Sequence, residues 1–407
     1  MTRSPATCCC TSAAVCSEVP LPQTLIISEA PFSLSNGFGV TMNTIFHGWP
    51  SERLRLIFTR AGTEPMRDVC PTAVFADVPG HWGRRYGAQF MLGMRPTWRG
   101  RYSPAWLTRT TRGWSADVVY ALVFSGETLA FASWIAGRLR RPLVAHIADD
   151  GLETQKSGVT SSIRDLLAGA AARITISEEM RAEYAQRYGL DSQVLHNGAA
   201  AELLTDDGVA ASPETYTVRY LGSVVPTHHF HAIEDIAEAV RRLHASGLPV
   251  RFELCGGEWT RPHAETLVDG RAVVYRGHVD RALGFDLLKT ADLLVVPVNF
   301  DAEAFRHVRL SLPTKLAESL GSGTPTLVYG PAGSAPVEFC RRHGVGSVID
   351  RRSVDHVADF IRTAMADRSA ARLRAQRDRE LIRRQYSADA VRVAFRAALC
   401  DAAGRAC

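Results

Sequence analysis

Thr314 and Lys315 have the residue types and the position that can hold a phosphate group. Pro313, just before them, suits the first turn of a helix, whose unpaired N–H groups and partial positive charge attract anions. Lys315 is one of only three lysines in the chain, and a cation is unfavourable at such a helix start. A lysine there makes physical sense if an anion such as a diphosphate also lies there.

Glu318 lies one turn further along the same predicted helix, on the same side as Lys315. A carboxylate can accept two hydrogen bonds from a vicinal diol such as that of ribose. The alternative is an i,i+3 surface ion pair between Lys315 and Glu318, worth about 0.3 kcal/mol. Phosphate and ribose binding explains more of the stretch, because it also accounts for Pro313.

Glycines mark two further loops in which backbone amides could come close to a phosphate. Gly37 and Gly39 open a predicted helix after the first strand, and a tight turn that needs glycine is the alternative. Their spacing is not G-x-G-x-x-G, which argues against a dinucleotide site. Gly222 and Ser223 end another strand, and three histidines follow them. We expect these histidines to be solvated residues at a helix start and not metal ligands, since no acidic partner accompanies them: His228, His229 and His231.

Two adjacent carboxylates, Asp149 and Asp150, follow an apolar run over 143–147. At the carboxyl end of a strand they could bind a sugar hydroxyl or act as a base, whereas an Asp helix cap is the alternative. His146 alternates inward along the same run, and we expect it to be a core histidine.

The elements that position these residues alternate between apolar strand-like runs and helical periodicity. The first set of strand-like runs covers 24–28, 54–59, 73–78, 118–124, 143–147 and 173–177. A second set follows a polar stretch over 206–214 and covers 216–221, 250–254, 272–275, 292–297 and 325–329. Runs that are apolar on both faces and separated by helices predict a parallel sheet covered on both sides. The chain is therefore predicted to be α/β, with two Rossmann-like, doubly wound domains that face a cleft.

Four segments follow from this division. We expect a flexible tail over 1–20, Rossmann-like domains over 21–205 and 206–385, and a C-terminal helix over 386–407 that can pack back on the first domain. Ligands of open parallel sheets bind beyond the carboxyl ends of the strands. The loops named above should therefore face the opposite domain.

Length and composition exclude several classes of protein. A chain of 407 residues is too long for one ordinary core. Its 47 basic and 42 acidic residues give a net charge of +5, which does not favour bulk nucleic-acid binding. No apolar run reaches the length of a membrane helix, and the start lacks the apolar core of a signal peptide. The nine cysteines lack the paired spacing of a zinc site, so we expect a cytoplasmic protein with reduced thiols and no metal.

The segment 81–114 contains no acidic residue and mixes arginines with aromatic residues. Such a segment suits an anionic lipid surface or a phosphorylated acceptor, and we expect peripheral membrane contact here. Arginines that stack on aromatic rings at a partly buried surface are the alternative.

Several stretches, in this order along the chain, resemble the retaining glycosyltransferases of family 4, which have two Rossmann domains in the GT-B arrangement. They are VAHIADDGLE (144–153), ITISEEMRAEYAQRYG (174–189), VLHNG (194–198), YLGSV (220–224), FELCGG (252–257), VVYRGHVD (273–280) and SLPTKLAESLGSGTPTLVYGP (311–331). The last of these resembles the nucleotide-binding helix of that family. The resemblance covers roughly residues 22–350.

The resemblance implies an acceptor-binding first domain and a second domain that binds a nucleotide sugar. Glu318 would then hold the ribose, and Lys315 with the amides around Thr314 would lie near the diphosphate. Gly37 and Gly39 would approach that diphosphate from the first domain, and Gly222 and Ser223 from the second. Asp149 or Asp150 would face the sugar or the acceptor, so the implied catalytic residues are Asp149, Asp150 and Lys315.

Two departures from the family's pattern affect the donor site. Leu310 stands where the family commonly has a glutamate near the donor sugar, and Ser223 stands where it often has an arginine. Thr227, His228 and His229 lie near the position of the family's lysine. Three residues before Leu310 are candidates to replace the missing glutamate: Glu303, Arg306 and Arg309.

The resemblance implies a hexosyl transfer, with retention, from a nucleotide-diphosphate sugar to a saccharide, lipid-linked or other hydroxyl acceptor. The implied route is front-face substitution, in which the departing phosphate deprotonates the acceptor. No metal cofactor is expected if lysine and arginine carry the charge. Two alternatives stay open: a hydrolysing nucleotide-sugar epimerase, supported by His146 and the two aspartates, and a non-catalytic relative that binds without reaction.

Overall fold

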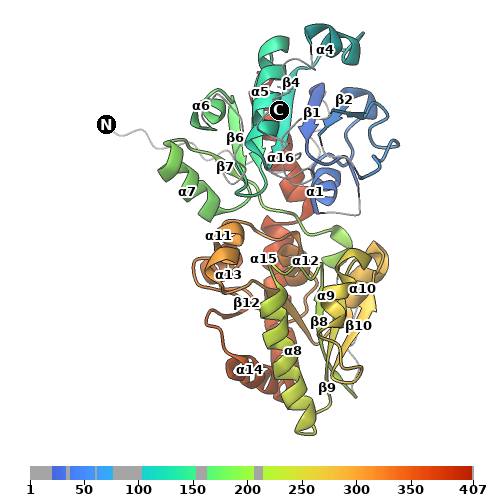
Figure 1. Cartoon of the computed structure of the whole chain (residues 1–407), viewed down its shortest axis with the longest axis vertical. Coiled ribbons are helices and arrows are strands. Elements are labelled where there is room, and N and C mark those ends of the chain that lie inside the picture. Colours follow the sequence, from blue (N-terminus) through green and yellow to red (C-terminus); the bar gives the residue numbers. More distant parts are fainter. Residues whose placement is uncertain are drawn as a thin grey trace, which may run out of the picture.

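The computed structural model describes residues 21–33, 37–59, 62–76, 103–152, 163–205 and 214–405. The tail expected over 1–20 and much of the basic aromatic segment, 81–102, lie outside these residues. Two parallel sheets, each with its own helices, lie one above the other along the long axis of the molecule (Figure 1). We call them the first and the second domain.

The first domain contains a seven-stranded parallel sheet with the strand order β3-β2-β1-β4-β5-β6-β7. Its strands are β1 (Thr24–Ser28), β2 (Leu54–Phe58), β3 (Val74–Phe75), β4 (Val118–Val123), β5 (Leu143–Ile147), β6 (Ala172–Thr175) and β7 (Gln193–Val194). The chain starts at the centre with β1, moves to one edge, and then returns to β4 beside β1. This reversal makes a switch point at the carboxyl ends of β1 and β4, where doubly wound sheets bind ligands.

The second domain repeats this topology with six parallel strands in the order β10-β9-β8-β11-β12-β13. They are β8 (Tyr216–Leu221), β9 (Val250–Cys255), β10 (Val273–Gly277), β11 (Leu293–Pro297), β12 (Thr326–Tyr329) and β13 (Ser347–Ile349). Its switch point lies between β8 and β11. The prediction of two doubly wound α/β domains is therefore confirmed.

Helices connect the strands of both domains. In the first domain they are α1 (Gly37–Ile45), α4 (Pro104–Thr110), α5 (Gly126–Leu139), α6 (Ile163–Ala168) and α7 (Glu178–Tyr188). In the second they are α8 (Phe230–Ala245), α9 (Arg261–Glu265), α10 (Arg281–Thr290), α11 (Ala302–Val308), α12 (Thr314–Gly321), α13 (Ala335–His343), α14 (Val354–Ala366) and α15 (Arg368–Gln385). Serines cap four of these helices, α4, α5, α7 and α14; for example, the Ser125 and Ser177 hydroxyls accept hydrogen bonds from the amides of Thr128 and Met180.

Three local differences from the sequence-based expectations concern short elements. No helix was predicted in the segment after β11, but it contains helix α11. Strand β13 was not predicted, because its three residues give too short an apolar run. Strand β3 is shorter than the run expected over 73–78.

The chain crosses between the domains twice, near residues 195–200 and 385–388. The two crossings lie side by side, since the Ala199 amide donates to the Tyr386 carbonyl and the Ala388 amide donates to the Ala199 carbonyl, both at 2.8 Å. A Cβ atom on Gly198 would lie 2.7 Å from the Cα of Ala388, so only glycine allows this approach. The two crossings therefore act as one packed connection.

After the second crossing, α16 (Ala388–Ala402) lies in the first domain beside α1 (Figure 1). Phe395 on its inner face packs edge-on against Phe46 and Tyr120, with ring centroids 5.0 and 5.1 Å away. The end of the chain thus completes the core on one face of the first sheet.

Three of the cysteines, Cys70, Cys255 and Cys340, are buried free thiols. Cys400 on α16 is disulfide-bonded, so the expectation of reduced thiols is wrong at that position. Among the helices that the structure describes, none combines the length and the apolar composition needed to cross a bilayer.

Candidate functional site

Helix α12 begins without a side-chain cap, at the carboxyl end of the second sheet. Its N-cap residue is Pro313, whose side chain offers no acceptor to the first-turn amides. Within the described residues, the amides of Thr314 and Lys315 donate no hydrogen bond. The helix start therefore presents free N–H donors together with the positive end of the helix dipole.

Lys315 folds back from this helix start towards the carboxyl end of β8. Its Nζ donates a hydrogen bond of 2.8 Å to the Tyr220 hydroxyl and lies 4.5 Å from the centre of the Tyr220 ring. In the described part of the chain, no carboxylate forms an ion pair with this amino group, so the surface pair with Glu318 is not formed. Burial lowers the pKa of Lys315 to about 8, so the group is still largely charged at neutral pH.

Gly222 makes room for the Lys315 amino group. A Cβ atom on Gly222 would lie 2.3 Å from Nζ and 3.0 Å from the Tyr220 hydroxyl oxygen, so a larger residue would displace the lysine. Ser223, next to it, accepts a hydrogen bond of 2.8 Å from the Tyr220 hydroxyl through its backbone carbonyl. The predicted Gly222 and Ser223 therefore lie beside Lys315.

The histidines after Ser223 do not all lie where the sequence suggested. His231 is exposed, as expected of a residue at a helix start. His229 instead is largely enclosed, and its Nδ1 atom is buried without a hydrogen-bond partner. Burial, with the nearby charge of Lys315, lowers the pKa of His229 well below its usual value, so this imidazole is neutral. The expectation of three solvated histidines is wrong for His229.

Glu318 lies on α12 one turn after Lys315, with its side chain about one-fifth exposed. Its nearest cationic partner is Arg281 at the start of α10, with Nη2 and Oε1 separated by 3.9 Å. Burial raises the pKa of Glu318, and the charges of Arg281 and Lys315 oppose that rise. The carboxylate thus lies near a cation but forms no short ion pair with it. Its oxygens can therefore still accept hydrogen bonds from a ligand.

The three residues before the N-cap Pro313 are tied to the first domain at three points. The hydroxyl of Ser177, at the start of α7, donates to the Leu310 carbonyl at 2.7 Å. The Ser311 hydroxyl donates to the Asp149 carboxylate, after β5. The Asn197 side-chain amide donates to the Leu312 carbonyl at 3.3 Å. The start of α12 therefore faces the first domain and not bulk water.

Leu310 itself inserts into the core of the first domain, although it belongs to a loop of the second. It is 2 % exposed and packs with residues of β5, α5 and α7. This residue stands where the resembled family has a glutamate, so here the position joins the domains. The polar group that would meet a donor sugar must come from another residue.

Shortening this side chain should weaken the whole molecule. We expect Leu310→Ala to lower the free energy of unfolding by about 2–4 kcal/mol, because it leaves a cavity in the first-domain core. Chemical denaturation followed by fluorescence measures the change, and Leu373→Ala, at a leucine 55 % exposed, is the matched control. A Leu310→Ala protein as stable as the unchanged one would show that this contact between the domains does not form.

The first domain contributes helix α1 to the same region. Gly37 at its start is exposed, with open space where a Cβ atom would be, whereas a Cβ atom on Gly39 would lie 2.2 Å from the Ser33 carbonyl oxygen. Gly39 is thus required for close packing of the helix on its own loop. Thr41, one turn on, donates to the side-chain oxygen of Asn197 at 2.9 Å. Since Asn197 also contacts Leu312, α1 lies close to the start of α12.

The two adjacent aspartates have different partners. Asp149 accepts from Ser311 and from the Asp150 amide, so its carboxylate lies at the contact between the domains. Asp150 accepts from the Tyr184 hydroxyl at 3.1 Å and pairs with Arg187 at 3.2 Å, both on α7. Of the two aspartates, Asp149 is thus the one that contacts the segment before α12.

The three candidates to replace the missing glutamate also differ in their partners. Arg309 pairs with Glu183 of α7 at 2.9 Å and so joins the ion pairs around Asp150. Glu303 and Arg306 lie on α11 with exposed side chains. The structure brings none of the three into contact with Lys315 or Glu318.

His146 is a core residue, as the sequence predicted. Its Nδ1 lies 2.7 Å from the Tyr120 hydroxyl, and burial lowers the pKa of His146 to about 3. A histidine that stays neutral over the physiological range inside the first sheet gives no support to the epimerase alternative.

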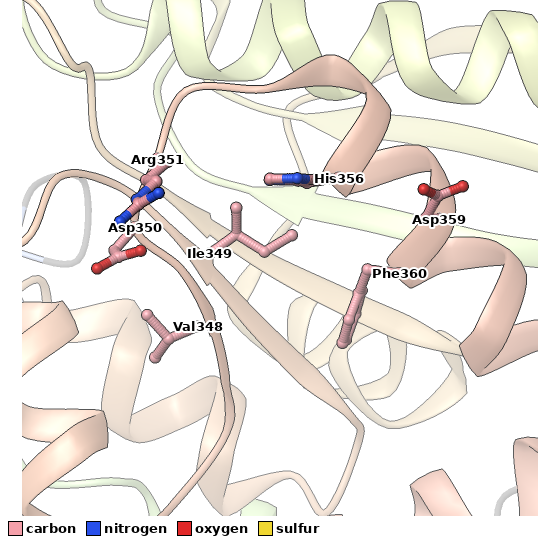
Figure 2. Close-up of a pocket in the computed structure, with 7 residues that line it drawn as sticks. All are labelled: Val348, Ile349, Asp350, Arg351, His356, Asp359 and Phe360. Carbon is pink, nitrogen blue, oxygen red and sulfur yellow. The ribbon is translucent and has the colours of Figure 1, made fainter.

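A separate hollow of about 440 Å³ lies at the edge of the second sheet, between β13 and the first turns of α14. Figure 2 shows the side chains that line it, including Ile349, Asp350, His356 and Phe360. None of the predicted site residues lines this hollow. The residues gathered at the start of α12 therefore lie outside this hollow.

Sequence reasoning missed Tyr220, the burial of His229, the contacts of Asn197 and the packing role of Leu310. For Tyr220 and Leu310, the sequence itself contained a recognisable pattern. The first is a polar-tipped residue near the end of a buried strand, two residues before a glycine, and the second is an apolar residue in a polar segment. The hydrogen-bond partners of Asn197 are distant in sequence, and so is Lys315, whose charge acts on His229, so no local pattern could reveal either.

Two doubly wound domains, with the uncapped start of α12 facing the first, form the two-domain arrangement of the GT-B class. Residues 37–198 match the family model for the glycosyl transferase 4-like domain. This match covers most of the first domain, and it is in line with the resemblance to family 4 glycosyltransferases inferred from the motifs.

Solved structures of GT-B proteins share this fold at low sequence identity. HepE from Anabaena, in complex with UDP, has 14% identity and a TM-score of 0.64 over 93% of this chain and 99% of its own. A glycosyltransferase from Rickettsia africae has 10% identity and a TM-score of 0.61, covering 93% and 98%. Sucrose-phosphate synthase from Thermosynechococcus elongatus has 13% identity and a TM-score of 0.61, covering 91% and 96%. A search of the curated proteins found no match.

Proposed function

We propose that this protein transfers a hexosyl group, with retention, from a nucleotide-diphosphate sugar to a hydroxyl acceptor. The observation that carries the proposal is the state of Lys315. Its ammonium group is buried at an uncapped helix start, is held by a neutral phenol, and has no carboxylate partner among the described residues. A buried charge without a counter-charge is costly, and an anionic ligand would supply that counter-charge.

A diphosphate is the anion that this arrangement suits best. It can accept hydrogen bonds from the Thr314 and Lys315 amides and from the Lys315 ammonium at the same time. When the bond between the sugar and the diphosphate breaks, negative charge grows on the leaving phosphate. Donors already fixed in place stabilise that charge, and this is the main electrostatic contribution that a transferase can make.

The remaining residues take roles according to their places. Glu318 binds the ribose hydroxyls, and Gly222 with Ser223 borders the phosphates. Gly37 and Gly39 bring the start of α1 to the same cleft, and Asp149 faces the sugar or the acceptor. Because Lys315 and the helix start supply the positive charge, we propose that no metal cofactor is required.

UDP-glucose is the first donor to test, because the HepE protein of the same fold was solved with UDP-glucose. We propose a saccharide or lipid-linked acceptor and action in the cytoplasm. Peripheral membrane contact through residues 81–114 stays a proposal. In the described part of that segment, Trp106 and Trp114 pack on the first-domain core, and Arg55 lies 5.3 Å from the Trp114 ring centre. Those two tryptophans are therefore engaged with the protein.

The direct test begins with thermal shift in UDP, GDP, dTDP and ADP, because a ligand that binds only the native state raises the melting temperature. The nucleotide that binds is then supplied as its sugar conjugate, with EDTA present, and the anomeric configuration of the released or transferred sugar is read by NMR. We expect slow release with retention. An epimerised sugar would indicate the epimerase, and a protein that binds none of the four nucleotides would overturn the proposal.

A further inference from the structure

A hydrogen-bonded chain holds the Lys315 amino group in one place. Its Nζ donates to the Tyr220 oxygen at 2.8 Å, and the Tyr220 hydroxyl donates to the Ser223 carbonyl at 2.8 Å. Tyr220 is fully buried, and burial raises the pKa of its phenol far above neutrality, so the hydroxyl always carries its proton. The direction of both hydrogen bonds is therefore fixed, because a protonated amine can only donate.

This support differs from an ion pair in its effect on charge. A carboxylate at the same place would fix the lysine equally well, but it would cancel the charge that an anionic ligand needs. The Tyr220 oxygen and ring face stabilise the cation while leaving it positive. Two of the three N–H bonds of Lys315 have no acceptor within the described residues, so they remain available to a ligand.

We propose that Tyr220 is a positioning residue for Lys315. It keeps the Lys315 ammonium charged and directs it, at the start of α12, towards the diphosphate of the donor. This inference rests on the proposed function, since it concerns the same site. Gly222 is part of the arrangement, because any Cβ atom there would occupy the place of the amino group.

The charged and titratable groups around Lys315 come from several elements. Glu318 on α12 favours its charged form, while His229 in the loop after β8 is close enough to be affected by its charge. His228 lies beside His229, and Arg281 on α10 pairs with Glu318. Tyr220 supplies the hydrogen bond that favours the protonated amine, so its loss should lower the pKa of Lys315 further.

The first experiment compares Tyr220→Phe with the unchanged protein in binding UDP, or whichever of the four nucleotides binds, and its nucleoside. We expect about threefold to thirtyfold weaker binding of the diphosphate, unchanged binding of the nucleoside, and an alkaline loss of diphosphate binding that begins at lower pH. Tyr329→Phe, which removes another buried hydroxyl in the same sheet, is the control and should change none of these. Equal diphosphate affinity and an unmoved alkaline limb in Tyr220→Phe would overturn the inference.

The second experiment needs no nucleotide and so separates this inference from the proposed function. With ¹³C at lysine Cε, the three lysines give three NMR signals, and Lys315→Met assigns one of them. We expect the Lys315 signal to titrate at lower pH in Tyr220→Phe than in the unchanged protein. Identical midpoints would refute the role of Tyr220. Failure of the unchanged protein to bind any of the nucleotides would instead refute the proposed function and leave this titration valid.

Discussion

Lys315→Met is expected to abolish useful binding of nucleoside diphosphates while making the free protein more stable. Methionine keeps the long apolar stem against Tyr220 but removes the ammonium group. The ligand then loses its charge-assisted hydrogen bonds, so we expect the affinity for UDP to fall by about 100-fold. The affinity for uridine, which has no phosphate, should hardly change.

The stability gain follows from the cost of burying Lys315. Folding lowers the pKa of this lysine from 10.5 to about 8, so the folded state binds its proton less tightly than the unfolded chain does. Below pH 8 both states carry the charge, and the full cost of burial is present. Between pH 8 and 10.5 only the unfolded chain is protonated, so the stability of the unchanged protein rises through this window. Lys315→Met should therefore gain about 1–3 kcal/mol below pH 8, and the gain should vanish towards pH 10.5.

Calorimetric titration with UDP and uridine measures the change in affinity. Thermal unfolding between pH 6 and pH 10 measures the change in stability. Lys289→Met is the matched control, because Lys289 on α10 is another described lysine and its Nζ donates to the Thr205 hydroxyl, away from α12. It should leave UDP binding unchanged. If Lys315→Met binds UDP as tightly as the unchanged protein, the diphosphate site is not at the start of α12.

The architecture could be predicted from sequence because it depends on local apolar patterns. The runs at 24–28 and 143–147 are largely apolar on both faces, and each coincides with an observed strand. Elements whose stability comes from distant contacts could not be predicted. Strand β13 has only three residues and depends on β12, and α11 lies in a polar segment.

The site was predictable only where the residues are close in sequence. Thr314, Lys315 and Glu318 share one helix, so their common place follows from helical spacing. Leu310 stands out in the sequence as an apolar residue among polar ones, but its packing partners could not be inferred, because they lie on elements of the other domain. Asp150 was equally ambiguous, since its partner Arg187 is 37 residues further along the chain. Side-chain partners between domains are set by tertiary structure, and no local period encodes them.

Glu318→Ala should produce the opposite selectivity to Lys315→Met. If the Glu318 carboxylate accepts hydrogen bonds from the ribose hydroxyls, its removal leaves those hydroxyls unpaired in a largely buried place. We expect UDP and uridine both to bind more weakly by about 1–3 kcal/mol, whereas inorganic pyrophosphate should bind as before. Glu380→Ala, at an exposed residue that pairs with Arg383, is the control and should bind all three ligands normally.

The pH dependence of UDP binding provides an independent test of the role of Glu318. Burial raises the pKa of Glu318, and only the ionised carboxylate can accept from both hydroxyls, so UDP binding should weaken as the pH falls through that raised pKa. Glu318→Gln keeps one acceptor oxygen and cannot titrate, so its weaker binding should lack this acid limb. Calorimetric titration across the acid range measures both effects. An acid limb that persists in Glu318→Gln would assign it to another group, and an unchanged UDP affinity in Glu318→Ala would remove the ribose from this helix.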